Sequence, residues 1–287
     1  MNKVLKWVCT GIVTGALLLT GTTGLISKTE VVSAATIKPL TVDQMMGKLT
    51  AASKTLKSYH LNSIKKQNLQ IGDMSFSNKN TLDVDINRQP KFAAIGTFNL
   101  EFLDTTFDFD LYANDNEFYY LVDGSTLLDE EYGYEEYEVE DTGEAIDPDG
   151  LYWITMEKEE WDILYSKGQF DPASVLDSVK NYKKSMKVTD VGSQSILQFT
   201  VTEPKAAKAM INLYDRDLVM EAETVQPKSV TWKLYVNKKT FQTEKLTVDM
   251  SYVLVESGEK ENITTKVEAK YTSHNKIAAV VKPAEIE

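Results

Sequence analysis

Hydrophobic and polar residues alternate strictly along three stretches in the first half of the chain. Aliphatic side chains alternate with Asp and Asn over residues 82–87, and Phe or Leu alternates with polar residues over 97–102 and 107–112. This period of two is typical of antiparallel strands with one buried face and one solvated face. Candidate turn residues lie beside these stretches, at Gly72-Asp73, Asp104-Thr105 and Asn114-Asp115-Asn116. The pattern predicts a meander of long strands from about residue 58 to 123.

The same alternation returns in the second half of the chain. It predicts strands at 195–202, about 228–236, about 242–255 and about 261–273, with turns at Lys238-Lys239 and Ser257-Gly258. Both groups of strands are long and apolar on one side. We therefore expect them to join in a single curved sheet.

Helical periodicity is clearest just before the first strand. Thr41 and Gln44 form a capping-box pattern, and apolar residues then recur on one helical face: Val42, Met45, Met46, Leu49 and Leu56. Further helices are predicted at about 157–167, from Asp171 as N-cap with Pro172 in the first turn, and at about 204–214.

These elements predict an α+β fold. A curved antiparallel sheet, shaped as an incomplete β-barrel, buries its one-sided strands when a few helices cover its apolar face. No repeat and no Pro- or Ser-rich linker divides the chain, so residues 36–287 are expected to form one domain.

The first 35 residues have the order of features of a secretory signal peptide. Lys3 and Lys6 precede an uncharged apolar run over 11–20, and small residues surround Ala34. The run is shorter than the roughly 20 residues that span a membrane, although an uncleaved anchor is the alternative. Cys9 precedes most of the apolar run and is therefore a poor site for lipid attachment. We expect the mature chain to be secreted or extracellular, either free or associated with the cell envelope.

Acidic residues dominate the charge of the chain. The formal net charge is −12, and it becomes −14 without the signal segment, which carries three Lys and one Glu. Such a chain repels nucleic acid, so no nucleic-acid partner is expected. Residues 129–149 hold eleven acidic side chains and no basic one, which predicts a solvated acidic loop. Docking of a cationic protein partner is an alternative for this loop, and loose calcium binding is another, although the register of an EF-hand is missing.

Catalytic machinery is not visible in the sequence. The chain has two histidines, His60 at a strand start and His274 near the end of the last strand, which approach each other only if the end strands meet. No zinc-protease, nucleophile-elbow or phosphate-loop motif occurs. We therefore expect neither an enzyme nor a bound cofactor or metal.

Short motifs in this layout resemble a known group of secreted Gram-positive proteins of unknown function. The motifs are residues 56–60, which lead from the first helix into the first strand, residues 234–241, and the ends 271–275 and 281–286. The group has the fold of the lipoprotein carrier LolA and the mycobacterial lipoprotein LppX. The resemblance covers about residues 40–287 and implies an incomplete antiparallel barrel, covered by helices, that encloses an apolar cavity for acyl chains.

The resemblance implies a binding or carrier protein for a lipid or other apolar ligand at the cell envelope. No residue carries over singly, because a wall of apolar side chains would bind the ligand. Candidate lining residues are Met45, Met46, Phe98, Phe102, Phe107, Phe109, Trp161 and Trp232, for which ordinary core packing is the alternative. The alternative function is a cell-surface protein-interaction or sensing module without a small-molecule ligand.

Overall fold

The computed structural model describes residues 40–102, 105–124, 147, 149–219, 224–256 and 259–286. The predicted signal peptide lies outside the described residues. So does the predicted acidic loop, apart from Asp147 and Asp149, and so do the predicted turn at Ser257-Gly258 and the Asp104 position of another turn.

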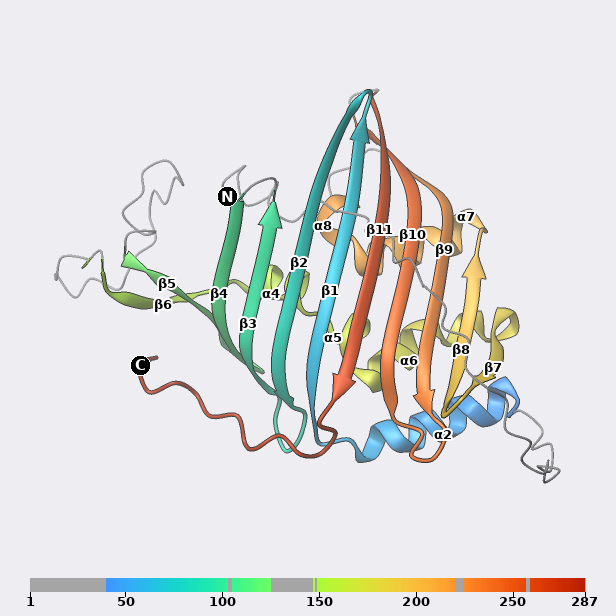
Figure 1. The fold of residues 1–287 in the computed structure, drawn as a ribbon, viewed down its shortest axis with the longest axis horizontal. Coiled ribbons are helices and arrows are strands. Elements are labelled where there is room, and N and C mark those ends of the chain that lie inside the picture. Colours follow the sequence, from blue (N-terminus) through green and yellow to red (C-terminus); the bar gives the residue numbers. More distant parts are fainter. Residues whose placement is uncertain are drawn as a thin grey trace, which may run out of the picture.

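Eleven strands form one antiparallel sheet in the order β6-β5-β4-β3-β2-β1-β11-β10-β9-β8-β7 (Figure 1). Strands β1 to β6 run outward to one edge. The chain then crosses to the opposite edge, and β7 to β11 return until β11 pairs with β1. The strands are β1 (Ser58–Ile71), β2 (Met74–Asn87), β3 (Ala93–Phe102), β4 (Thr105–Asn114), β5 (Phe118–Asp123), β6 (Leu151–Thr155), β7 (Lys187–Val191), β8 (Gln194–Val201), β9 (Thr224–Asn237), β10 (Thr243–Glu256) and β11 (Glu259–Thr272).

The predicted meander and the joining of both strand groups in one sheet are confirmed. The sheet is open, since β6 and β7 at its edges each pair with a single neighbour. Two predicted turns are also present: Gly72 adopts the positive φ of a tight turn, and Asn114 closes the β4–β5 connection by accepting from the backbone N–H groups of Asn116 and Glu117. Strands β6 and β7 were not predicted, because each is a five-residue edge strand without clear alternation.

Gly96 lets β3 approach β2 closely. A Cβ atom at this position would lie 2.0 Å from the Asp83 carbonyl oxygen and 2.7 Å from the Val84 Cα atom. Real side chains do not tolerate such contacts, so only glycine fits here without a shift of the backbone.

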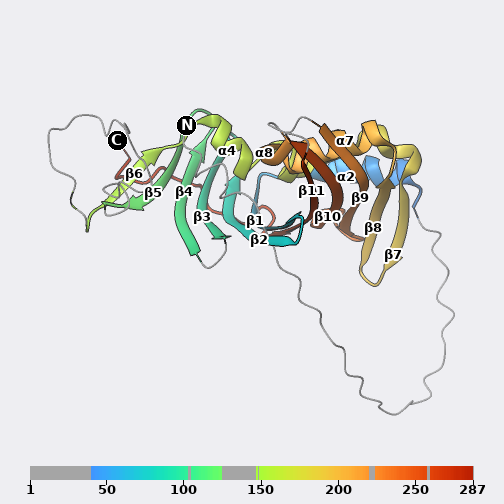
Figure 2. The same cartoon turned by 90° about the horizontal axis from the view of Figure 1, so that it is seen from above.

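The helices lie on one side of the sheet (Figure 2). They are α2 (Val42–Thr55), α4 (Lys158–Leu164), α5 (Lys167–Phe170), α6 (Pro172–Val179), the 3-10 helix η2 (Lys180–Ser185), α7 (Pro204–Tyr214) and α8 (Arg216–Val219). The predicted capping box of α2 is confirmed, and Asp171 caps α6 by accepting from two backbone N–H groups. The helix predicted over 157–167 is shorter in the structure: α4 ends at Leu164, and the next helix, α5, begins at Lys167.

Helices α4 to η2 form the crossover between the two edges of the sheet. After β6 the chain must reach β7 at the opposite edge, and it does so across the helical side (Figure 1). Arg88, just after β2, holds this layer together. Its guanidinium donates to the carbonyl oxygens of Ser53 and Leu56 at the end of α2, and it forms an ion pair of 2.5 Å with Asp171.

The C-terminal segment 273–286 runs along the ends of β1 to β5 (Figure 1). Asn275 accepts a hydrogen bond from the backbone of Lys57, and Asn87 accepts one from the backbone of Val280. Lys282 reaches Glu117 at the β4–β5 turn. The segment therefore ties the last strand to the first half of the sheet.

Candidate functional site

Strand register places one row of side chains across the helical side of the sheet. The row contains Val267 of β11, Lys65 of β1, Asn80 of β2, Leu100 of β3 and Phe107 of β4, each directly opposite the next. Directly paired residues of antiparallel strands point to the same face. The row therefore changes from apolar to polar and back to apolar within five neighbouring strands.

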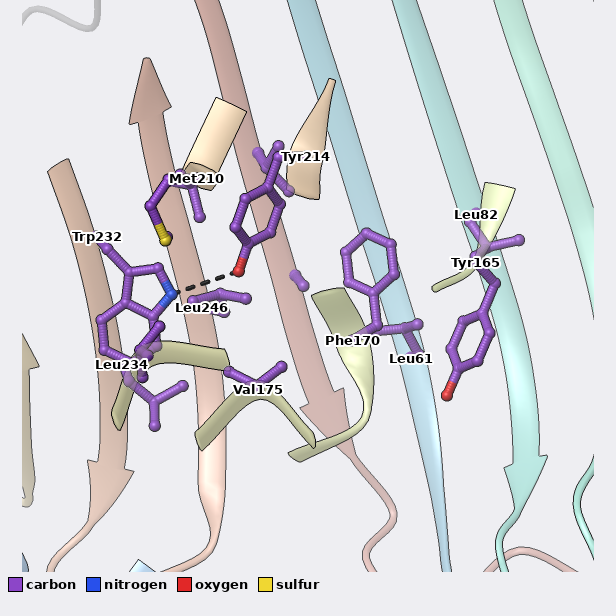
Figure 3. Packing of buried hydrophobic residues seen from close by; sticks show 14 of the residues in the cluster. Leu61, Leu82, Tyr165, Phe170, Val175, Met210, Tyr214, Trp232, Leu234 and Leu246 are labelled. Carbon is purple, nitrogen blue, oxygen red and sulfur yellow. Dashed lines mark hydrogen bonds between the residues drawn. The ribbon is translucent and has the colours of Figure 1, made fainter. Parts of the chain in front are cut away.

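The part of this face formed by β8 to β11 is a filled core. Trp232 has no exposed surface, stacks on Phe199 at 5.2 Å between ring centroids and donates through Nε1 to the Tyr214 hydroxyl at 3.3 Å. Figure 3 shows this hydrogen bond, with Met210 of α7 close to the indole ring. Helix α7 packs here against β9, and protein atoms take up the space over Trp232.

A buried polar cluster lies at the centre of the face. It consists of Lys65 and Gln67 of β1, Tyr252 of β10, Thr265 of β11 and Asp215. The Asp215 carboxylate is fully buried. Its Oδ1 atom meets Lys65 Nζ at 3.0 Å and Gln67 Nε2 at 2.9 Å, and its Oδ2 atom accepts from Tyr252 at 2.8 Å and Thr265 at 2.5 Å. Four donors, one of them the Lys65 cation, thus compensate the buried charge.

Asp215 lies at the junction between the end of α7 and the start of α8. Its backbone N–H closes the last turn of α7 on Ile211, and its carbonyl accepts from Leu218 and Val219 in α8. The side chain therefore leaves the junction of α7 and α8 and reaches the middle of the sheet. The buried polar cluster connects this junction to β1, β10 and β11.

Two asparagines of β2 extend the polar surface toward β3. Asn78 lies opposite Gln67 and Phe102, and Asn80 lies opposite Lys65 and Leu100. The Oδ1 atom of Asn80 is buried and has no hydrogen-bond partner. Most buried polar atoms in proteins have a partner, so this carbonyl oxygen needs an explanation.

Beyond Asn78 and Asn80 lies a group of aromatic side chains that we call the aromatic wall: Phe102, Phe107, Phe109 and Tyr120. All four retain partial exposure, in contrast to the buried Phe98 and Leu100 beside them. Phe107 stacks with Phe109 at 6.5 Å, and Tyr120 meets Phe109 edge to face at 5.7 Å. Aromatic rings in such offset and edge contacts form a firm apolar surface.

The eight predicted lining residues do not form one group. Phe98, Phe102, Phe107 and Phe109 come together on β3 and β4. Trp161 of α4 is buried against Phe118 of β5, at 5.6 Å between ring centroids. Trp232 lies in the filled core, while α2 carries Met45, fully buried, and Met46, partly exposed. A lining role for the buried members stays a prediction, and it requires the helices to move.

Sequence reasoning missed the buried polar cluster. Ser63, Lys65 and Gln67 occupy alternate positions on the same side of β1 as Tyr59 and Leu61, which are fully buried. Polar residues at the inward positions of a strand are the signal that could have drawn attention to this region. Asp215 gave no such signal, because it follows an amphipathic helix as an ordinary C-cap residue.

Several tyrosines are buried along the helical side, among them Tyr59, Tyr165, Tyr214 and Tyr271. Tyr59 and Tyr165 share a hydrogen bond of 3.0 Å between their hydroxyls. Burial, which disfavours the charged phenolate, raises the pKa of all four hydroxyls above the ordinary value. They therefore act as neutral polar groups in the core.

The two histidines have separate partners. His60 lies 2.9 Å from Asp85 and 3.4 Å from Asp83, whereas His274 meets the carbonyl oxygen of Thr243 at 2.8 Å. Burial lowers the pKa of His274 below its ordinary value. Across the part of the chain that the structure describes, no group of three His, Cys, Asp or Glu side chains is arranged to hold a metal ion. No helix among those residues combines the length and apolar character needed to cross a membrane.

A family model matches more than half of the chain. The Family of unknown function (DUF6612) matches residues 128–287, which include β6 to β11 and all helices from α4 to α8. No curated protein matches the chain.

Several solved structures are similar over most of the chain at low identity. LprF from Mycobacterium bovis is 10% identical with a TM-score of 0.42, and the match covers 85% of this chain and 97% of LprF. A DUF1329 family protein from Desulfovibrio piger is 9% identical with a TM-score of 0.25, covering 86% and 97%. The MucA/MucB complex of Pseudomonas aeruginosa is also 9% identical, with a TM-score of 0.24, covering 86% of this chain and 60% of that chain.

Proposed function

We propose that this chain, which belongs to the Family of unknown function (DUF6612), binds a lipid or other apolar ligand and carries it at the cell envelope. The observation that carries the proposal is the aromatic wall. Its four side chains remain partly exposed on the helical side of the sheet, whereas the side chains that β8 to β11 direct to that side are buried. An apolar ligand placed there would remove aromatic surface from water, which contributes about 0.8 kcal/mol for each buried CH₂ group.

The helices supply a means of loading and release. In this proposal they cover the apolar face, and α4 packs beside the aromatic wall through Trp161, which stacks on Phe118 of β5. Helices α4 to α6 and η2 belong to one crossover connection, so a shift of this layer would widen access to β3, β4 and β5. Ligand entry and exit would then need movement of helices while the sheet stays intact.

The proposal includes the absence of catalysis. The most deeply buried charged group, Asp215, already accepts hydrogen bonds from Gln67, Tyr252 and Thr265 and pairs with Lys65. A carboxylate held in this way is a structural anion, whereas a general base needs a lone pair directed at a substrate proton. We therefore propose that the chain binds a ligand and does not catalyse a reaction.

The test is native mass spectrometry of the mature chain secreted from a Gram-positive host, followed by solvent extraction of bound material. The expected result is a discrete added mass that extracts as lipid. Phe107→Ala should weaken retention by about twofold to tenfold, since loss of an aromatic contact removes roughly 0.5–1.5 kcal/mol.

The matched control is Thr106→Ala, at the neighbouring exposed position on the other side of β4, which should leave retention unchanged. A bare polypeptide mass, still bare after incubation with membrane lipids, would overturn the proposed function.

A further inference from the structure

Polar and aromatic surfaces meet along one line of the sheet. Asn78 lies directly opposite Phe102, and Asn80 lies opposite Leu100, which in turn lies opposite Phe107. Neighbouring strands are about 4.8 Å apart, so Phe107 on β4 lies about 10 Å from Asn80 on β2. A molecule lying across these strands would meet a polar surface at one end and the aromatic wall at the other.

At the polar end, around Asn80, one buried acceptor has no hydrogen-bond donor. Both oxygens of Asp215 accept from protein donors, and Lys65 balances its charge at 3.0 Å. The Oδ1 atom of Asn80, in contrast, is buried and has no donor. Among the buried side-chain oxygens described at this end, that carbonyl oxygen is the one without a hydrogen-bond donor.

An unused acceptor selects for a donor. A hydroxyl group can donate to the Asn80 Oδ1 atom, whereas a fully ionised phosphate or a carboxylate can only accept. The ion pair between Lys65 and Asp215 is neutral as a pair, so it provides no net positive charge to offset the desolvation of an anion. The chemistry of this end therefore favours a neutral group with hydroxyls over an anionic group.

We propose that Asn80 binds the head group of an amphiphilic ligand, that this head group is neutral and carries hydroxyls, as in a glycerol or sugar, and that the acyl part lies along Leu100 and the aromatic wall. The inference rests on the proposed function and assigns the ligand class and a specificity-determining residue to the same site. Lys65 and Asp215 act as positioning residues, because they fix the surface around the Asn80 amide.

The experiment compares three probes that share one acyl length, namely monodecanoylglycerol, decyl phosphate and methyl decanoate, each titrated calorimetrically into the delipidated mature chain. The expected result is binding of monodecanoylglycerol about tenfold or more tighter than decyl phosphate. Asn80→Leu should weaken monodecanoylglycerol by about fivefold to tenfold, the typical effect of one lost hydrogen bond, and leave methyl decanoate unchanged.

The matched control is Thr81→Val, at the adjacent position on the opposite side of β2, which should change none of the three affinities. Two results would show that the inference is wrong while the proposed function stands. In the first, the wild-type chain binds methyl decanoate and monodecanoylglycerol but does not favour the glyceride over decyl phosphate. In the second, Asn80→Leu weakens the binding of methyl decanoate and of monodecanoylglycerol equally. If none of the three probes binds, the inference is wrong, and the native mass measurement decides the proposed function. The comparison of probes on the wild-type chain keeps the test valid even where a variant folds poorly.

Discussion

Replacement of Asp215 by Asn tests whether the buried polar cluster anchors the helices to the sheet. The substitution keeps the shape of the side chain but removes the negative charge that Lys65 meets at 3.0 Å. It also replaces one accepting oxygen by an NH₂ group. That group faces either Lys65 and Gln67 or Tyr252 and Thr265, all of which now donate to Asp215.

The structure sets the expected magnitude. The Asp215 side chain is fully buried and that of Lys65 is 16% exposed, so Asp215→Asn leaves an ammonium group with little access to water. Removing one partner of a buried ion pair typically costs about 3–5 kcal/mol. In a domain of this size each kcal/mol shifts Tm by about 2–4 °C, so we expect Tm to fall by roughly 6–20 °C.

Urea unfolding followed by tryptophan fluorescence measures this loss, since fully buried Trp232 donates to Tyr214, the residue directly before Asp215. A double-mutant cycle with Lys65→Met isolates the pair. Replacing both charges by neutral groups removes the buried ammonium as well, so the double variant should lose less than the sum of the singles by roughly 0.5–3 kcal/mol.

The comparison pair is Lys158 and Asp162, an exposed i,i+4 ion pair on α4. Asp162→Asn should change the free energy of unfolding by less than about 0.5 kcal/mol. If Asp215→Asn changes it equally little, or if the cycle with Lys65 shows no coupling, the cluster does not anchor the helices and the reasoning is refuted.

Two further predictions concern stability in the absence of ligand. Asn80→Leu should raise the free energy of unfolding by about 1 kcal/mol in urea titrations, because it removes a buried acceptor without a partner, and a loss of stability would contradict the assignment of that atom. Burial raises the pKa values of Tyr59, Tyr165, Tyr214 and Tyr271 above 10.0. The unfolded state therefore loses these protons first, and the stability that the four groups contribute below pH 10.0 is lost as pH rises further. Their phenolate absorbance should therefore appear together with unfolding in an alkaline titration, and gradual ionisation of a still folded chain would show that they are accessible.

Local patterns were sufficient to predict the long strands and most helices. Alternation over 82–87, 97–102 and 107–112 identified β2, β3 and β4, because each strand buries one side and exposes the other. The same pattern could not reveal β6 or β7, since a short edge strand has one neighbour and little burial to enforce alternation. Nor could it reveal that α4 ends before Tyr165, whose ring is buried in the core.

The buried polar cluster depends on pairings that a linear pattern does not contain. Asp215 lies 148 residues beyond Gln67 in the sequence, and their contact arises only when β11 pairs with β1 and α7 lies across the sheet. Along β1, alternation places Ser63, Lys65 and Gln67 on the same side as Tyr59 and Leu61. It does not show which groups these polar side chains meet there, and only the tertiary structure supplies those partners. Alternation can therefore mark inward polar positions on one strand, but it cannot show that residues from β1, β10, β11 and the end of α7 meet in one cluster.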